Sequence, residues 1–161
     1  MARSIASFVP RAACDEAVVE RVRRICAGYA ALSFSLTDVT TFPGGFVCLV
    51  PEPDGGVRAL MRALWDEFPE TPPYRGEIDD PDPHVTVGWS AEGRDDPELL
   101  EVVRRRVEPL LPADCRVDSV SLYEETQPGR WRLRERAPLA GLTARRPIAA
   151  DRDRTAGRSA R

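Results

Sequence analysis

The tripeptide His84-Val85-Thr86 carries the residues most suited to chemistry, and His84 is the only histidine among the 161 residues. An imidazole is the side chain whose unperturbed pKa lies nearest neutral pH, so it is the usual general acid or base. In a β-strand, residues two apart point to the same face, so His84 and Thr86 would project together. The alternating positions Val85, Val87 and Trp89 would face the opposite layer. A proton carrier beside a hydroxyl donor suits chemistry at a phosphate, whereas a histidine without a catalytic role is the plainer alternative.

Hydrophobic periodicity predicts the elements that position this motif. Helices are expected after the capping residues Asp15, Asp54 and Asp96, the second ending at Pro69. The third should bury Leu99, Val103, Val107 and Leu110. The predicted strands are Leu32 to Phe42, Phe46 to Val50, the motif strand, Val117 to Tyr123 and Arg130 to Arg136. The order of helices and strands indicates an α+β fold.

Several residues near the motif could contact a substrate. Tyr74 could stack on a base or pack on the body of the protein, and Arg75 could act beside it. The acidic residues upstream of His84 are Asp79, Asp80 and Asp82. If one of these carboxylates approached the imidazole it would favour the imidazolium form, whereas a solvated acidic loop is the alternative.

Arginines recur at every second position of the last predicted strand, namely Arg130, Arg132, Arg134 and Arg136. In a strand they would share one face, opposite Trp131 and Leu133. Guanidinium groups bind phosphates bidentately, so this face could follow a nucleic-acid backbone. A charged face that protects an edge strand is the other explanation.

Composition sets limits on the class of protein. The chain is 42% hydrophobic and 30% charged, as is ordinary for a globular domain, and no apolar run approaches the length of a membrane span. The N-terminus lacks the layout of a signal peptide, so we expect a cytoplasmic protein. Its four cysteines form no Cys-x-x-Cys pair, and no phosphate-binding loop for ATP is present. We therefore expect neither a metal nor a cofactor.

Charge divides the chain into two parts. Residues 142–161 contain six arginines and two aspartates, a charge of +4, which leaves −7 on the rest of a chain whose net charge is −3. An acidic body argues against general nucleic-acid binding, so any RNA contact would be local. We expect a structured domain over residues 1–140 and a disordered arginine-rich tail over 141–161.

The motif and its surroundings resemble the two-histidine phosphoesterase superfamily, which includes 2′-5′ RNA ligase-like proteins and cyclic phosphodiesterases. His84-Val85-Thr86 is similar to the His-x-Thr motif of that group. The similarity extends over residues 1–140, through Phe8-Val9-Pro10, Pro43-Gly44-Gly45, Phe46 to Pro53, Val57 to Leu60, Phe68 to Tyr74 and Trp131-Arg132-Leu133.

The resemblance implies a bilobal fold of mostly antiparallel sheets, with helices packed outside and a central cleft. It implies general acid–base chemistry, without a metal, on an RNA-like 2′,3′-cyclic phosphate or a 2′-5′ linkage. His84 would be the general acid or base, and Thr86 would donate a hydrogen bond to the phosphate. Tyr74, Arg75 and Arg132 would contact the substrate. The partner would be a nucleotide or an RNA terminus, with no membrane, and we expect a monomer.

Members of this superfamily carry two such motifs, and this sequence has one. Met1 and Arg3 stand where the first histidine and threonine are expected. Either the chain begins too late, which we expect, or the first site has been lost. Losing one member of an acid–base pair costs about 10²- to 10⁴-fold in rate. A non-catalytic module that binds a nucleotide or an RNA end is therefore the second hypothesis, and a structural or partner-binding protein is the third.

Overall fold

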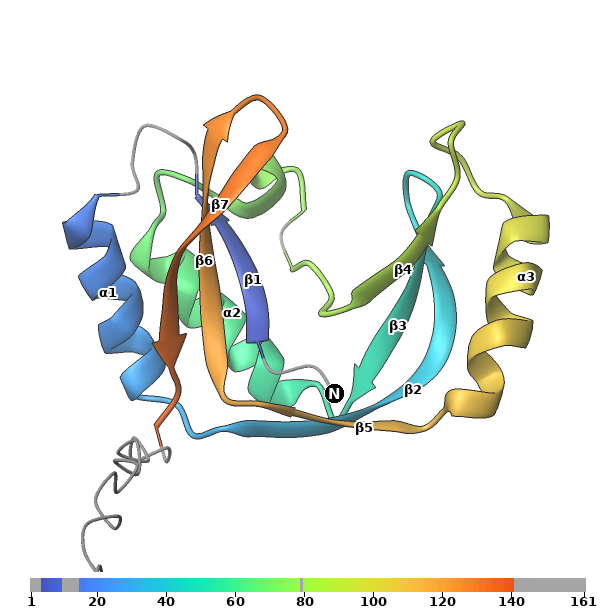
Figure 1. Ribbon diagram of the computed structural model, residues 1–161, viewed down its shortest axis with the longest axis horizontal. Helices are drawn as coiled ribbons and strands as arrows, with labels where there is room; N and C mark the ends of the chain where they lie inside the picture. The colour runs from blue at the N-terminus through green and yellow to red at the C-terminus, as the bar shows by residue number, and fades with distance from the viewer. Residues whose placement is uncertain (1–3, 10–14, 79, 141–161) are drawn as a thin grey trace, which may run out of the picture.

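Two β-sheets, each covered on one face by helices, form the two lobes of the computed structural model, which describes residues 4–9, 15–78 and 80–140 (Figure 1). Met1, Arg3 and the predicted tail over 141–161 lie outside the described residues. The helices are α1 (Glu16–Ala27), α2 (Gly55–Glu67) and α3 (Pro97–Val107), with 3₁₀ turns at Pro73–Gly76 and Glu108–Leu110. The strands are β1 (Ser4–Val9), β2 (Leu32–Phe42), β3 (Phe46–Glu52), β4 (Val85–Trp89), β5 (Ala113–Val117), β6 (Ser119–Gln127) and β7 (Arg130–Pro138).

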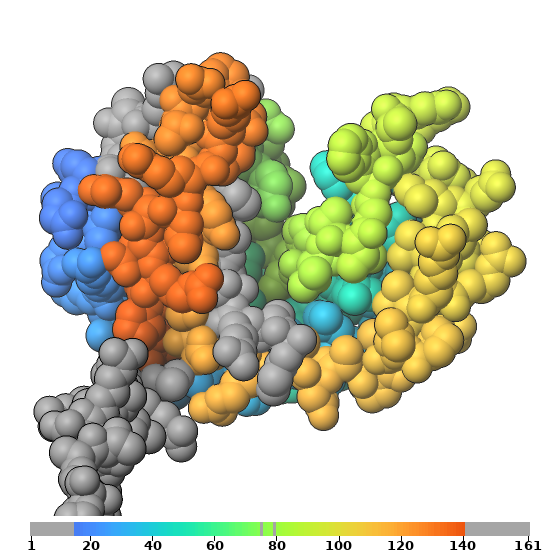
Figure 2. All heavy atoms as spheres, viewed as in Figure 1, coloured from blue at the N-terminus to red at the C-terminus, as the bar shows by residue number. Residues whose placement is uncertain are grey.

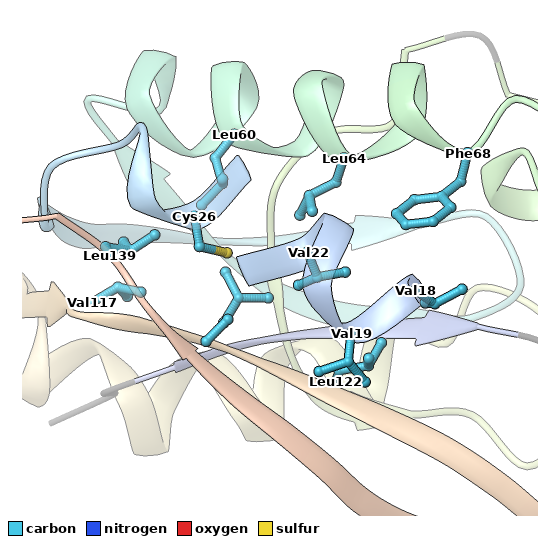
Figure 3. Close-up of a cluster of buried hydrophobic side chains, with 12 residues drawn as sticks. Val18, Val19, Val22, Cys26, Leu60, Leu64, Phe68, Val117, Leu122 and Leu139 are labelled. Carbon is cyan, nitrogen blue, oxygen red and sulfur yellow. The ribbon is translucent and has the colours of Figure 1, made fainter. Parts of the chain in front are cut away.

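The first lobe contains the sheet β1-β6-β7 and the helices α1 and α2. β1 runs parallel to β6, and β7 is antiparallel to it. Buried side chains of both helices pack on those of β6 and β7 (Figure 3). They include Val22 and Cys26 from α1, Leu60 and Leu64 from α2, and Leu122 from β6. Burying apolar side chains of this size is worth about 1.5–3 kcal/mol each, so this core fixes α2 firmly in the first lobe.

The second lobe is the antiparallel sheet β4-β3-β2-β5, with α3 on one face. Val47 and Leu49 of β3 point toward α3 and pack with Leu99 and Val103. β4 is an edge strand, and its Gly88 lies so close to α3 that a Cβ there would be 3.3 Å from Val103 Cγ2. Space-filling atoms show a deep hollow between the two lobes (Figure 2). The predicted α+β, bilobal arrangement with helices outside is confirmed.

Capping explains two of the three helix starts. Asp15 accepts a hydrogen bond from the Val18 backbone N–H at 3.0 Å, and Asp96 accepts from Glu98 and Leu99 at 3.0 Å each. Asp54 also precedes its helix as predicted, but its carboxylate makes no capping bond and binds Arg58 instead. None of the helices in the described ranges is long and apolar enough to cross a membrane.

Three predictions about elements were wrong. The strand expected at Val117 to Tyr123 begins instead at Ser119 as β6, and Val117 is the last residue of β5, a strand of the other sheet that was not predicted. Leu110 is 69% exposed rather than part of the core, because the helix gives way to a 3₁₀ turn before it.

The third error concerns the arginines of β7, which do not share a face. A register shift leaves Arg134 as an extra residue between Leu133, which pairs with Tyr123, and Glu135, which pairs with Leu122. Arg132 therefore lies on the face covered by α1, beside Glu124, and Arg136 lies on the other face with Trp131 and Leu133.

Candidate functional site

His84 stands immediately before β4, half-buried, with its ring held from two sides. Nδ1 donates a hydrogen bond to the backbone carbonyl of Asp82 at 2.7 Å. The ring stacks on Phe42 with centroids 4.6 Å apart and planes inclined by 29°. A carbonyl can only accept, so the neutral ring carries its hydrogen on Nδ1 and leaves Nε2 as the proton acceptor. The imidazole is thus oriented to take or give a proton at Nε2.

Thr86 lies exposed on β4 with its hydroxyl next to a buried thiol. Its Oγ1 is 3.6 Å from Sγ of Cys48, which is fully buried on β3. Burial raises the pKa of the Cys48 thiol, an effect that the Thr86 hydroxyl partly offsets. Because the sulfur stays protonated at neutral pH, its S–H can donate to Oγ1. The threonine hydrogen is then available to a ligand.

A bulge in β4 changes which side chains share the face of Thr86. Thr86 pairs with Cys48 and Gly88 pairs with Val47, so Val87 is an extra residue between them. Trp89 pairs with Phe46 and therefore lies on the same face as Thr86, away from α3. The prediction that Trp89 faces the opposite layer was wrong for this reason.

This face presents exposed aromatic surface beside Thr86. Trp89 is 68% exposed and Phe46 is 42% exposed. Val85 pairs with Leu49 and so lies on the opposite face, toward α3, as predicted, although Val85 and Val87 are each 40% exposed. The edge strand β4 and its neighbour β3 therefore offer a hydroxyl and two aromatic side chains on the face away from α3.

A surface pocket of about 390 Å³ lies next to the histidine. Phe42, whose ring stacks on His84, lines it, as do Asp82 and Pro83 immediately before the histidine. Thr40, Pro51 and Arg58 complete most of its wall. The imidazole therefore stands at the border of a polar hollow and not in a sealed interior.

In the described part of the acidic loop before the motif, the carboxylates of Asp80 and Asp82 bind arginines of α2. Asp82 Oδ1 is 2.7 Å from Nη2 of Arg58, and Asp80 is bound by Arg58 at 3.4 Å and by Arg62 at 3.0 Å. Asp79 lies outside the described residues. The carboxylates of Asp82 and Asp54 raise the pKa of the Arg58 guanidinium above its ordinary value. Asp80 and Asp82 are exposed, as in the solvated loop that was the alternative, and their carboxylates also bind Arg58 and Arg62.

Of the other predicted substrate contacts, the structure describes the side chains of Tyr74 and Arg132. Tyr74 is 53% exposed in its 3₁₀ turn, where it takes a positive φ of 51°, and it is not packed on the body. The side chain of Arg75 lies outside the described residues. Arg132 forms an ion pair with Glu124 at 2.6 Å on the helix-covered face of β7 and does not line up with Arg136, and its contact with a substrate stays a prediction.

Three residues of the site were not predicted from the sequence. Phe42 and Cys48 were assigned to strands but not to the surroundings of the motif, and Arg58 was not singled out. The Asp54/Arg58 pair at i, i+4 was a readable signal of a charge pair on α2. Among the described residues, no group of three or more His, Cys, Asp and Glu side chains is arranged to hold a metal ion.

Comparison with protein families places the chain in a known group. Residues 5–129 match the family model described as the 2′-5′ RNA ligase superfamily, so the matched region includes all the residues of the site. The search of curated proteins found no match.

Proposed function

The chain belongs to the 2′-5′ RNA ligase superfamily, and on that premise we propose that it binds a phosphate ester of an RNA-like terminus and hydrolyses it slowly. The ester would be a 2′,3′-cyclic phosphate or a 2′-5′ linkage. The observation that carries the proposal is the arrangement of His84 and Thr86. The ring is held with Nε2 available, and the hydroxyl that can contact phosphate lies two residues later on the open face of β4.

The chemistry requires His84 to take up one proton and then release it. Nε2 takes a proton from water as its oxygen attacks phosphorus, and the P–O bond to one ribose oxygen breaks. The departing oxygen receives a proton from the imidazolium, or from solvent while the imidazolium releases its own proton to solvent, and either route returns His84 to its neutral form. Thr86 donates to a non-bridging phosphate oxygen, whose negative charge strengthens the bond.

The aromatic surface beside Thr86 favours a substrate that carries a nucleobase. Trp89 and Phe46 occupy paired positions on adjacent strands, and Cys48, which pairs with Thr86, is two residues along from Phe46. That spacing is about 6.6–6.8 Å, comparable to the distance from a base to its ribose phosphate. Stacking a base on an aromatic side chain contributes about 1–3 kcal/mol.

A second candidate is a module that binds the same ligands without cleaving them. The observation in its favour is the single histidine of the sequence, since acid–base catalysis at phosphodiesters is fastest with two proton-transfer groups. The two candidates share one binding face and differ only in whether product forms.

Incubation of the full chain with the four 2′,3′-cyclic mononucleotides and with 2′-5′-linked dinucleotides tests the proposal. We expect 2′- or 3′-monophosphates, or separated nucleotides, measured by chromatography. The His84→Asn variant, which keeps the size and polarity of the side chain, should lose about 10²- to 10⁴-fold in rate.

Two controls interpret the result. Trp89→Ala should weaken binding of cyclic nucleotides by about 5- to 100-fold and leave binding of inorganic phosphate unchanged. Leu110→Ala removes a similarly exposed apolar side chain remote from β4 and should change neither. Saturable binding without product would favour the second candidate. No binding, or product formation unaffected by His84→Asn, would overturn the proposal.

A further inference from the structure

We propose that Arg58 is a positioning residue: by holding Asp82 in place from the other lobe, it fixes the Nδ1–H tautomer of His84. This inference rests on the proposed function only for its consequence in catalysis. The tautomer and orientation of the His84 ring can be measured without any catalytic activity.

The contacts of Arg58 converge on the loop that precedes the motif. Its Nη2 is 2.7 Å from Asp82 Oδ1 and its Nη1 is 3.4 Å from Asp80 Oδ2. Asp54 Oδ2 accepts from the same side chain twice, from Nη2 at 2.8 Å and from Nε at 3.2 Å. The side chain is 26% exposed, so these bonds are partly shielded from solvent. Only a planar guanidinium can bind carboxylates through several fixed N–H groups at once.

Arg58 is held on a helix that is anchored in the core of the first lobe. Arg58 stands on α2 next to the buried Val57 and two residues before Leu60, which is 1% exposed in the core of the first lobe. β4, which follows His84, belongs to the sheet of the second lobe. Arg58, on α2 of the first lobe, therefore binds the loop that leads into β4 of the second lobe.

The loop transmits the position of Asp82 to the ring. Asp82 lies between Pro81 and Pro83, both of which are buried. A residue before proline is restricted to extended backbone, and each proline fixes its own φ. The Asp82 carbonyl therefore cannot rotate independently of its side chain without moving a packed proline, and it is this carbonyl that accepts from Nδ1 of His84 at 2.7 Å.

Phe42 alone cannot fix the tautomer. Its ring stacks on the imidazole and restrains the plane, but a stacked ring does not distinguish Nδ1 from Nε2. Only the carbonyl bond makes that distinction. If Asp82 shifts, the hydrogen can move to Nε2, and that nitrogen then cannot accept a proton from water.

The single histidine makes the test direct. In the full chain labelled with ¹⁵N-histidine, a long-range ¹H–¹⁵N correlation spectrum at a pH where the ring is neutral reports the tautomer of His84 alone. We expect the wild type to show the Nδ1–H form. Arg58→Ala should lower the population of that form by at least twofold and reduce the hydrolysis rate with little change in KM.

Arg62→Ala is the matched control, since Arg62 is on the same helix and binds Asp80 but not Asp82. It should leave the spectrum unchanged. Asp82→Ala, a change in an exposed loop side chain, should reproduce the effect of Arg58→Ala. The double variant should shift the tautomer no further than either single variant.

The outcomes separate this inference from the proposed function. An Nδ1–H form that persists in Arg58→Ala, with the variant folded by circular dichroism, overturns it. If Arg58→Ala does not fold, an unchanged spectrum for Asp82→Ala overturns it equally. A tautomer shift without detectable hydrolysis in any variant supports the positioning role and contradicts the hydrolytic function.

Discussion

At the scale of single residues, we expect the hydroxyl of Thr86 to donate a hydrogen bond to the phosphate of the ligand. Thr86→Ala removes the donor while leaving the exposed edge strand intact, and a hydrogen bond to a charged group is worth about 1.5–3 kcal/mol. We expect the Kd for a 2′,3′-cyclic nucleotide to rise by about 10- to 100-fold, measured by calorimetry.

Thr86→Ser is the matched control, because it keeps the hydroxyl beside Cys48. It should restore most of the affinity. Equal weakening by serine and alanine would assign the effect to the lost methyl group, and unchanged affinity in both would place the phosphate elsewhere.

Sequence reasoning at this scale located the motif but not its partners. The strand beginning at Val85 followed from the apolar run, yet the face of Trp89 could not, because a single extra residue at Val87 breaks the period of two. The partner of the imidazole is a backbone carbonyl, which no residue type encodes. Phe42 reaches His84 from a strand more than 40 positions earlier, so only the folded chain shows the contact.

At the scale of elements, α3 supports the strand that carries Thr86. Asp96 accepts from two backbone N–H groups at the start of this helix. Asp96→Ala should therefore lower the free energy of unfolding by about 1 kcal/mol, measured by urea denaturation. Asp96→Ser keeps a capping oxygen and should recover most of that loss. An unchanged stability in the alanine variant would show that the cap contributes nothing.

The contact between α1 and α2 predicts a pH dependence. Arg21 donates to Glu67 at 2.8 Å and lowers the pKa of that carboxyl from its ordinary 4.5, with Arg24 adding a second favourable charge. A lowered folded-state pKa contributes stability that is complete above 4.5 and is lost as the pH falls through the folded value.

Replacing Glu67 by glutamine should remove this contribution. The wild type should then lose free energy of unfolding more steeply than Glu67→Gln as the pH drops below 4.5, in urea titrations at a series of pH values. Parallel pH profiles for the two proteins would contradict the assignment.

Helices were easier to predict than strands for a local reason. Each helix combines a preceding aspartate with an apolar stripe at helical spacing, and both signals lie within the helix itself. β5 alternates apolar and charged residues over five positions only, and it is separated from β6 by Asp118 alone. The assignment of these two strands to different sheets depends on long-range pairing with β2 and β1.

At the scale of the whole molecule, two lobes enclose the hollow into which the motif strand opens. The bilobal form came from the resemblance to a known superfamily, since no repeat in the sequence encodes it. The tie from Arg58 to Asp82 joins the lobes at the entrance of β4, next to the pocket that borders His84. A change in the position of one lobe relative to the other would therefore also change the orientation of the His84 ring.

The most direct test of the central claim is a titration of the ¹⁵N-histidine-labelled chain with a 2′,3′-cyclic nucleotide, observed at the one imidazole. If the face of His84 and Thr86 holds a phosphate ester, the ring nitrogens should shift saturably, with the Kd obtained by calorimetry and with the larger change at Nε2. Ring signals that stay unmoved up to saturation of calorimetric binding, or up to millimolar nucleotide with no binding at all, would contradict the claim.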